Sequence, residues 1–283
     1  MRLPTASLLF LLLLVLLAAC GTSDAPATGE AVVTEKDGVK TVTLTPRKLP
    51  KGDGPNPPAE GFNLAGSDNV ALGVADSVVK YHGGRAAWDE VRYLTWNFFG
   101  ARTLNWDKHE SRVRIDVPDE NAVYLLDYSG EEPAGRVRIL GDEVTDEAAL
   151  REALGKAHSM FINDAFWLVH QFKLKDSGVT LRFAGEGMDP QAKRPSFIID
   201  QTFAGVGDTP ENRYRLYVDK VTYRINTWQF FRNAADTEPA IETPWLEYRP
   251  YGNILLSGDR GGRFQLSDIS VRKQLSERLF TEF

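Results

Sequence analysis

The hydrophobic pattern of the chain begins with one uninterrupted apolar run from Leu8 to Ala19, preceded by the basic residue Arg2. The run holds about a dozen residues, whereas a helix that spans a bilayer needs about twenty. A basic residue, a short apolar segment and small residues at its end are typical of an export signal that is removed. We therefore predict that residues 1–19 are a signal peptide and not part of the fold.

Two later segments, 68–81 and 146–161, carry apolar residues every three or four positions, and each predicts an amphipathic helix. The first ends at His82-Gly83-Gly84, and glycine readily adopts the left-handed conformation that terminates helices. Polar residues that can cap the helices stand at their starts: Ser67 or Asp68, and Thr145.

Most of the remaining chain alternates between apolar and polar residues, is rich in aromatic and β-branched side chains, and is broken by short turns. No repeat of βαβ units is present, which excludes a doubly wound fold. We predict a mainly β, α+β fold with one large antiparallel sheet of roughly ten strands. The expected strands are 91–99, 111–117, 122–127, 136–140, 179–185, 197–203, 213–218, 222–231, 245–248, 253–257 and 264–271.

Between the predicted signal and the first helix, residues 20–67 are rich in proline and glycine, for example at Pro50–Pro58. Such a composition does not form a packed element, so we expect a flexible tether there and one globular domain over residues 68–283. Within the tether, Val39–Leu44 alternates as a strand does, which leaves open a short strand docked on a sheet edge.

The charge balance limits the partners. Removing Arg2 with the signal leaves 32 basic against 39 acidic residues, a net charge of −7. Nucleic acid and anionic headgroups call for a positive surface, so we expect neither as the main partner. Cys20 is the single cysteine, which excludes an intramolecular disulfide and a cysteine-based metal site.

The sequence Leu17-Ala18-Ala19-Cys20 resembles the lipobox of bacterial lipoproteins. The resemblance implies cleavage before Cys20, attachment of lipid to Cys20, and a protein held at a membrane of the cell envelope. Gly21 follows the cysteine in place of an aspartate, which by analogy with lipoprotein sorting implies the outer membrane, facing the periplasm. The alternative is an ordinary signal peptide with a chance cysteine.

Several separated motifs also resemble, in their order, poorly characterised bacterial lipoproteins related to the outer-membrane lipoprotein carriers of the LolA, LolB and LppX type. This resemblance covers residues 68–283 and implies an unclosed, curved antiparallel β-barrel whose concave face is covered by helices. It also implies binding of a lipid or a lipoprotein acyl chain, and it implies no cofactor. Because Cys20 would tether this chain, the lipid-anchored receptor is a nearer analogue than the soluble shuttle. The motifs are Tyr81-His82-Gly83-Gly84, Trp88, Asn163–Leu168, Lys173–Val179 and Tyr214–Asp219.

Bulky apolar residues on shared faces form the candidate acyl-chain site. Residues two apart in a strand share a face, as do Trp96 with Phe98 and Trp228 with Phe230. The segment Asn163–Phe172 is strongly aromatic and lies outside the strand pattern, which suggests that it is a movable cover of the site. The alternative is that all of these residues are ordinary core. The candidate cavity and cover residues are Trp96, Phe98, Phe166, Trp167, Val169, Phe172, Trp228 and Phe230.

No catalytic signature is present in the sequence. The four histidines, His82, His109, His158 and His170, show no metal-ligand spacing, and His82 is placed to cap a helix. Gly205–Asp208 lacks a following helix, so it is a turn rather than a phosphate loop. Without a Gly-x-Ser-x-Gly elbow, we do not expect an enzyme. The alternatives that stay open are a structural surface lipoprotein that binds a protein or glycan and, less favoured, an envelope hydrolase with an unrecognised site.

Overall fold

The computed structural model describes residues 29–36, 39–46, 52, 54–205 and 207–283. Cys20 and the predicted signal peptide lie outside these residues. Among the described residues, no helix combines the length and the apolar character that crossing a bilayer requires. The helices are α1 Asn69–Tyr81, α2 Arg85–Glu90, α3 Glu147–Val169 and α4 Arg278–Thr281, with 3-10 turns η1 Pro118–Glu120 and η2 His170–Phe172.

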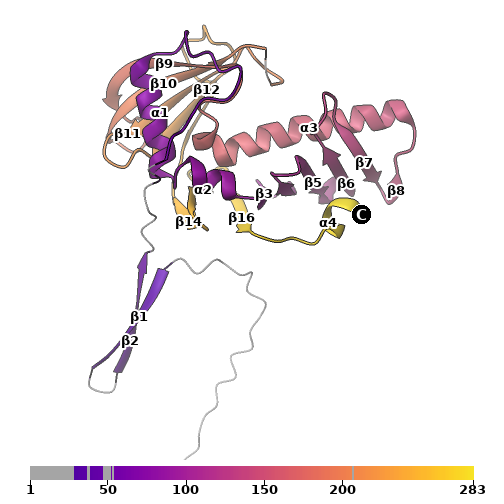
Figure 1. Cartoon of the computed structure of the whole chain (residues 1–283), viewed down its shortest axis with the longest axis horizontal. Helices are drawn as coiled ribbons and strands as arrows, with labels where there is room; N and C mark the ends of the chain where they lie inside the picture. The colour runs from indigo at the N-terminus through magenta and orange to yellow at the C-terminus, as the bar shows by residue number, and fades with distance from the viewer. Residues whose placement is uncertain (1–28, 37–38, 47–51, 53, 206) are drawn as a thin grey trace, which may run out of the picture.

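The strands form two main antiparallel sheets, neither of which is closed (Figure 1). A mainly β, antiparallel and unclosed fold is thereby confirmed, but the expectation of one large sheet is wrong, because strands β9–β13 pair only with one another. The seven-stranded sheet has the order β16 Leu266–Arg272, β3 Tyr93–Phe98, β4 Arg102–Asp107, β5 Arg112–Val117, β6 Ala122–Asp127, β7 Ala134–Ile139 and β8 Asp142–Glu143. The five-stranded sheet has the order β13 Ile241–Pro244, β12 Ile225–Phe231, β11 Arg213–Asp219, β10 Pro195–Phe203 and β9 Val179–Met188.

Two shorter pairs complete the described strands. Strands β14 Arg249–Tyr251 and β15 Ile254–Leu256 pair with each other, as do β1 Gly29–Lys36 and β2 Val39–Pro46. The alternation noted at 39–44 therefore belongs to a hairpin whose other strand was not predicted. The expected strand at 245–248 is limited to an isolated bridge between Leu246 and Asp259.

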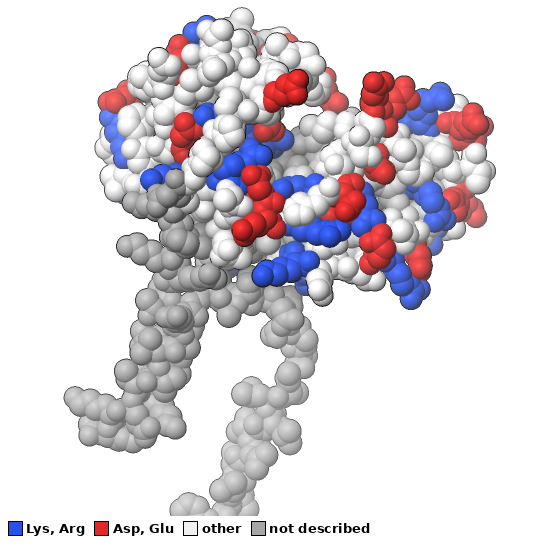
Figure 2. Space-filling model, in the orientation of Figure 1, with Lys and Arg blue, Asp and Glu red and all other residues white. Residues whose placement is uncertain are grey.

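The seven-stranded sheet buries one face and exposes the other. In β5, Val113, Ile115 and Val117 are buried while the alternate arginines and aspartate are partly exposed, as the pleat requires. Helix α3 packs over the buried face, against β5, β6 and β7 (Figure 1). On the opposite face, arginines pair with carboxylates, including Arg112 with Asp107 at 3.0 Å. Figure 2 likewise shows Lys and Arg side chains beside Asp and Glu side chains, without a large field of one sign.

Helix α3 is longer than its pattern predicts. It begins with Asp146, and not Thr145, as the cap, because the Asp146 carboxylate accepts a hydrogen bond from the backbone N–H of Ala149 at 2.9 Å. It continues through the aromatic segment to Val169 instead of ending at Phe161. The aromatic segment lacks the helical spacing of the preceding residues, and the one carboxylate in this part of the helix, Asp164, is buried against Arg102.

The helix α1 lies where the pattern predicts it and ends at His82. Gly83 and Gly84 follow with φ of 115° and 90°, conformations that glycine adopts at least cost. Residues on the N-terminal side of α1 also pack on the domain, since Ala59 N–H donates to the carbonyl of Lys175 and Phe62 is buried. The domain boundary predicted at residue 68 stays a prediction, and ordered contacts extend beyond it.

The hairpins β9–β10 and β11–β12 use the same kind of turn. Asp189 Oδ1 accepts from the amides of Gln191 and Ala192, and Asp219 Oδ1 accepts from those of Val221 and Thr222. Each turn closes through a residue with positive φ, Lys193 at 53° and Tyr223 at 52°. A carboxylate that satisfies the turn amides fixes where the next strand starts, so β12 begins at Ile225 and not at residue 222.

Candidate functional site

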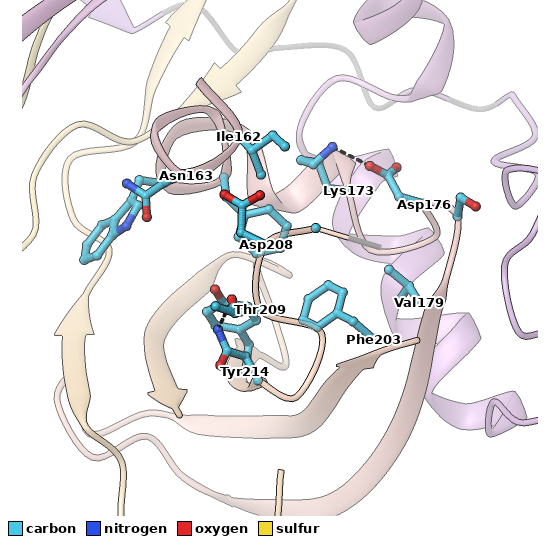
Figure 3. A pocket seen from close by; sticks show the side chains of 14 residues that line it. Ile162, Asn163, Lys173, Asp176, Val179, Phe203, Asp208, Thr209 and Tyr214 are labelled. Atoms are coloured by element: carbon cyan, nitrogen blue, oxygen red, sulfur yellow. Dashed lines mark hydrogen bonds and ion pairs between the residues drawn. The ribbon is translucent and has the colours of Figure 1, made fainter. Parts of the chain in front are cut away.

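A cavity of about 400 Å³ lies between the C-terminal part of α3, the segment after η2, and the loop that joins β10 to β11 (Figure 3). Its volume is within the range of small-ligand sites, which runs from roughly 300 to 1,000 Å³. Six apolar or aromatic side chains line it: Ile162, Phe166, Trp167, Val179, Phe203 and Tyr214. The remaining lining residues are Asn163, Lys173, Asp176, Ser177, Gly207, Asp208, Thr209 and Asn212.

Three of the lining rings contact one another. The Phe166 ring centroid lies 5.1 Å from that of Tyr214 and 6.0 Å from that of Phe203, and Phe203 and Tyr214 are 5.6 Å apart. These separations are those of favourable aromatic pairs. Burial raises the pKa of Tyr214 to about 12, so its hydroxyl is neutral at physiological pH. The helix and the five-stranded sheet thus form one aromatic wall.

A chain of hydrogen bonds ties the end of α3 to the five-stranded sheet. The indole N–H of Trp228 donates to His170 Nδ1 at 3.1 Å, and His170 Nε2 donates to Gln201 Oε1 at 2.6 Å. Because an indole is only a donor, Nδ1 must be the acceptor and the proton must sit on Nε2. Gln201 Nε2 then donates to the carbonyl of Lys173 at 3.2 Å. Burial lowers the pKa of His170 to about 3, so the ring is neutral and its role is structural.

A second tie comes from Arg260, whose side chain is almost completely buried. Its Nη2 donates to the carbonyl of Trp167 and its Nη1 to Ser257 Oγ, while its guanidinium lies 3.8 Å from the ring centroid of Trp245. Within the described part of the chain no carboxylate forms an ion pair with it, and burial lowers its pKa to about 9. The cation is therefore held by carbonyl, hydroxyl and ring contacts at the helix end that borders the cavity.

The predicted site residues divide into two groups. Phe166 and Trp167 line the cavity, whereas six others lie in the core around it. Trp167 links the cavity to this core, because its ring centroid lies 4.8 Å from that of Trp228 and 6.4 Å from that of Phe98. The six are Trp96, Phe98, Val169, Phe172, Trp228 and the partly buried Phe230.

That the segment Asn163–Phe172 is a movable cover of the cavity stays a prediction. In the structure this segment is the end of α3 with η2, and it is joined to its surroundings through Asp164, Trp167, His170 and Gln171. Phe203 and Tyr214 were not among the predicted site residues. Their alternation marked them as strand residues, but the side of the sheet that meets α3 depends on a register that the sequence does not specify.

The other histidines lie away from the cavity. His82 caps α1, with Nδ1 2.7 Å from the carbonyl of Val78, and burial lowers its pKa to about 4. His109 Nε2 lies 2.9 Å from the carbonyl of Asp89, and the ring of His158 stacks on Tyr128. The described residues contain no group of three or more histidine, cysteine, aspartate or glutamate side chains placed to hold a metal ion.

The fold and cavity define a mainly β protein with a partly polar, aromatic-walled site. No family model matches the chain, and no curated protein matches it. A crystal structure of a DUF1329 family protein from Desulfovibrio piger aligns with 74% of this chain and 96% of its own, at 14% sequence identity and a TM-score of 0.43.

Proposed function

We propose that the protein is a lipid-anchored envelope protein that holds a lipid or lipoprotein acyl chain in the cavity beside α3. The observation that carries this proposal is the cavity wall, where Phe166, Trp167 and Phe203 meet Tyr214 and Val179 in a space of about 400 Å³. The resemblance of the sequence to lipoprotein carriers supports the same ligand class. Cys20, in its lipobox, would keep the site close to a membrane that supplies such ligands.

The energetics favour a chain ligand over a compact polar one. Each CH₂ group moved from water into an apolar site gains roughly 0.8 kcal/mol, which is about a fourfold gain in affinity. Polar lining residues such as Asn163 and Thr209 leave room for a head group at one side. The arrangement therefore suits an amphiphile whose tail meets the apolar lining residues Ile162, Trp167 and Val179.

A chain-length series tests the proposal directly. Binding of uncharged alkyl glucosides with increasing chain length is measured by calorimetry on the purified protein, below the concentration at which each forms micelles. We expect affinity to rise about fourfold per CH₂ and then to level off once the cavity is filled. Affinity that does not depend on chain length, or no binding to any member, would refute the proposal.

A cavity-filling variant locates the site. Ile162, on α3, lines the cavity and is half-buried. Ile162→Trp therefore places a bulky ring in the cavity without removing a side chain from the core. Glu152→Trp is the matched control, because Glu152 is exposed on the same helix and does not line the cavity. We expect Ile162→Trp to weaken binding at least tenfold and Glu152→Trp to leave it unchanged. Equal effects of the two variants would place any binding elsewhere.

A further inference from the structure

Some of the charged side chains that line the cavity form an ion pair and one does not. Three lining residues have an acidic or basic side chain: Lys173, Asp176 and Asp208. Lys173 Nζ and Asp176 Oδ2 form an ion pair at 2.5 Å, visible at the edge of the site in Figure 3. The Asp208 side chain has no hydrogen bond or ion pair with any other described residue. The lining therefore carries a net charge of −1, located at Asp208.

The aromatic rings that line the cavity also favour a cation. Ring faces carry a negative quadrupole, so an ammonium group is attracted to Phe, Tyr and Trp rings within about 6 Å. Phe166, Phe203 and Tyr214 supply such rings next to the loop that carries Asp208. The uncharged polar lining residues can donate or accept and do not oppose this preference.

An anionic head group would meet the opposite conditions. A carboxylate or phosphate needs an available cation. The one lining lysine is paired with Asp176, and the buried guanidinium of Arg260 at the border of the cavity is bonded to the Trp167 carbonyl and to Ser257 Oγ. The nearby guanidinium of Arg102 is paired with Asp164 through two hydrogen bonds. A free acid in the cavity would thus face the unpaired charge of Asp208 without compensation.

We propose that the cavity selects amphiphiles whose head carries an ammonium group, with Asp208 as the counter-ion and the Phe166, Phe203 and Tyr214 rings as the cation-binding wall. This inference rests on the proposed acyl-chain function and adds the chemical class of the ligand. Asp208 is the residue that determines specificity for the head group.

The test compares three ligands with one alkyl chain and different heads: a trimethylammonium, a carboxylate and an uncharged glucoside. Calorimetry on the purified protein gives the three affinities at low and at physiological salt. We expect the ammonium ligand to bind at least tenfold more tightly than the carboxylate, with the glucoside between them. The difference should shrink at higher salt, because Asp208 is exposed and its field is screened.

Two variants locate the charge effect. Asp208→Asn removes the unpaired charge, and Glu211→Gln is its matched control, because Glu211 is exposed on the same loop but does not line the cavity. We expect Asp208→Asn to reduce the ammonium preference to threefold or less and Glu211→Gln to preserve it. The Asp208 side chain forms no hydrogen bond or ion pair with another described residue, so we expect the substitution to preserve the fold, and equal melting temperatures of the two variants check this.

The outcomes separate this inference from the proposed function. If the glucoside binds with the expected dependence on chain length but the ammonium ligand binds no more tightly than the carboxylate, the head-group inference fails alone. Stronger carboxylate binding that increases further in Asp176→Asn would show that Lys173 receives the head group, and would overturn the inference. If no ligand binds, the proposed function and the inference fail together.

Discussion

Arg102 on β4 donates through Nε and Nη2 to the two carboxylate oxygens of Asp164 on α3, at 2.5 and 2.6 Å. The aspartate is completely buried, while the arginine side chain keeps 19% of its surface exposed. The pair therefore joins the C-terminal part of α3 to the seven-stranded sheet. Asn163 Nδ2 adds a third hydrogen bond to the same carboxylate at 3.0 Å.

Removing the cation should cost more than removing the anion. Arg102→Met leaves a buried carboxylate without its partner, and we expect a loss of about 3–5 kcal/mol in the free energy of unfolding at pH 7. Asp164→Ala leaves an arginine that reaches water, so its cost should be smaller. Burial raises the pKa of Asp164 even in the intact pair, and loss of Arg102 raises this pKa further. Protonation of Asp164 at lower pH removes the unpaired buried charge, so the loss in free energy of unfolding caused by Arg102→Met should shrink as the pH falls. Urea unfolding at pH 7 and pH 5 measures the costs of the two substitutions and their pH dependence. An Arg102→Met cost that is equal at both pH values would contradict the role of Arg102 as partner of the buried Asp164 carboxylate.

The buried histidine His170 predicts destabilisation by acid. Its folded-state pKa is lowered to about 3, against an ordinary value of 6.5, so below pH 6.5 the unfolded chain binds a proton that the folded chain excludes. Stability from this group is fully present above pH 6.5 and is lost as the pH falls from 6.5 toward 3, by about 3 kcal/mol at pH 4.5.

We expect His170→Gln to be less stable than the parent at pH 7 and to lose less stability between pH 7 and pH 4.5. His109→Gln is the control, since His109 is exposed, and its pH profile should follow the parent. Urea unfolding across this range gives the slopes. A parent and a His170→Gln variant with the same slope would show that His170 does not stay neutral in the fold.

Gly83 should be irreplaceable for a reason beyond its backbone angle. A Cβ built at Gly83 would lie 2.2 Å from the carbonyl oxygen of Asn253, and Gly83 also has φ of 115°. Gly141 has φ of 96° but no atom within 4 Å of its Cβ position. We expect Gly141→Ala to cost about 1 kcal/mol from the angle alone and Gly83→Ala to cost at least about 2–3 kcal/mol more. Thermal and urea unfolding of the two variants provide the comparison, and equal costs would exclude the steric contribution.

The proposed lipid anchor has a direct chemical test. Cys20→Ser removes the thiol that would receive the lipid, so we expect it to abolish labelling by a fatty-acid analogue and to release the protein from the membrane fraction. Fractionation of the parent then tests the outer-membrane location that Gly21 implies. Unchanged labelling of Cys20→Ser, or recovery of the parent solely with the inner membrane, would contradict these expectations.

The sequence pattern predicts elements where one local signal is sufficient. The alternation of Val113, Ile115 and Val117 places β5 and its buried face, and Gly83 marks the end of α1. The pattern fails where a distant partner changes the meaning of a residue. The Asn163–Phe172 segment lacks helical spacing, and its Asp164 carboxylate is buried in the helix through an ion pair with Arg102, 62 residues away.

The candidate site could be predicted only in part for the same reason. Phe166 and Trp167 stand out because they follow an amphipathic helix within one aromatic segment. Phe203, Tyr214 and Asp208 join them through the register of β10 with β11, which pairs Gln201 with Tyr214. That register is a long-range property. The pairing of Lys173 with Asp176 is local, but only the fold shows that both residues and the unpaired Asp208 line one cavity.

The pairing of β3 with β16 has a consequence for the order in which the chain can fold. Thr95 lies opposite Ser270, so β3 can meet its outer neighbour only after the whole segment between β3 and β16 has been made. Until then β3 presents an open edge, which attracts strands of other chains. A chain translocated N-terminus first would carry that open edge for nearly the whole passage. We expect a shortened chain that lacks β16 to be prone to aggregate.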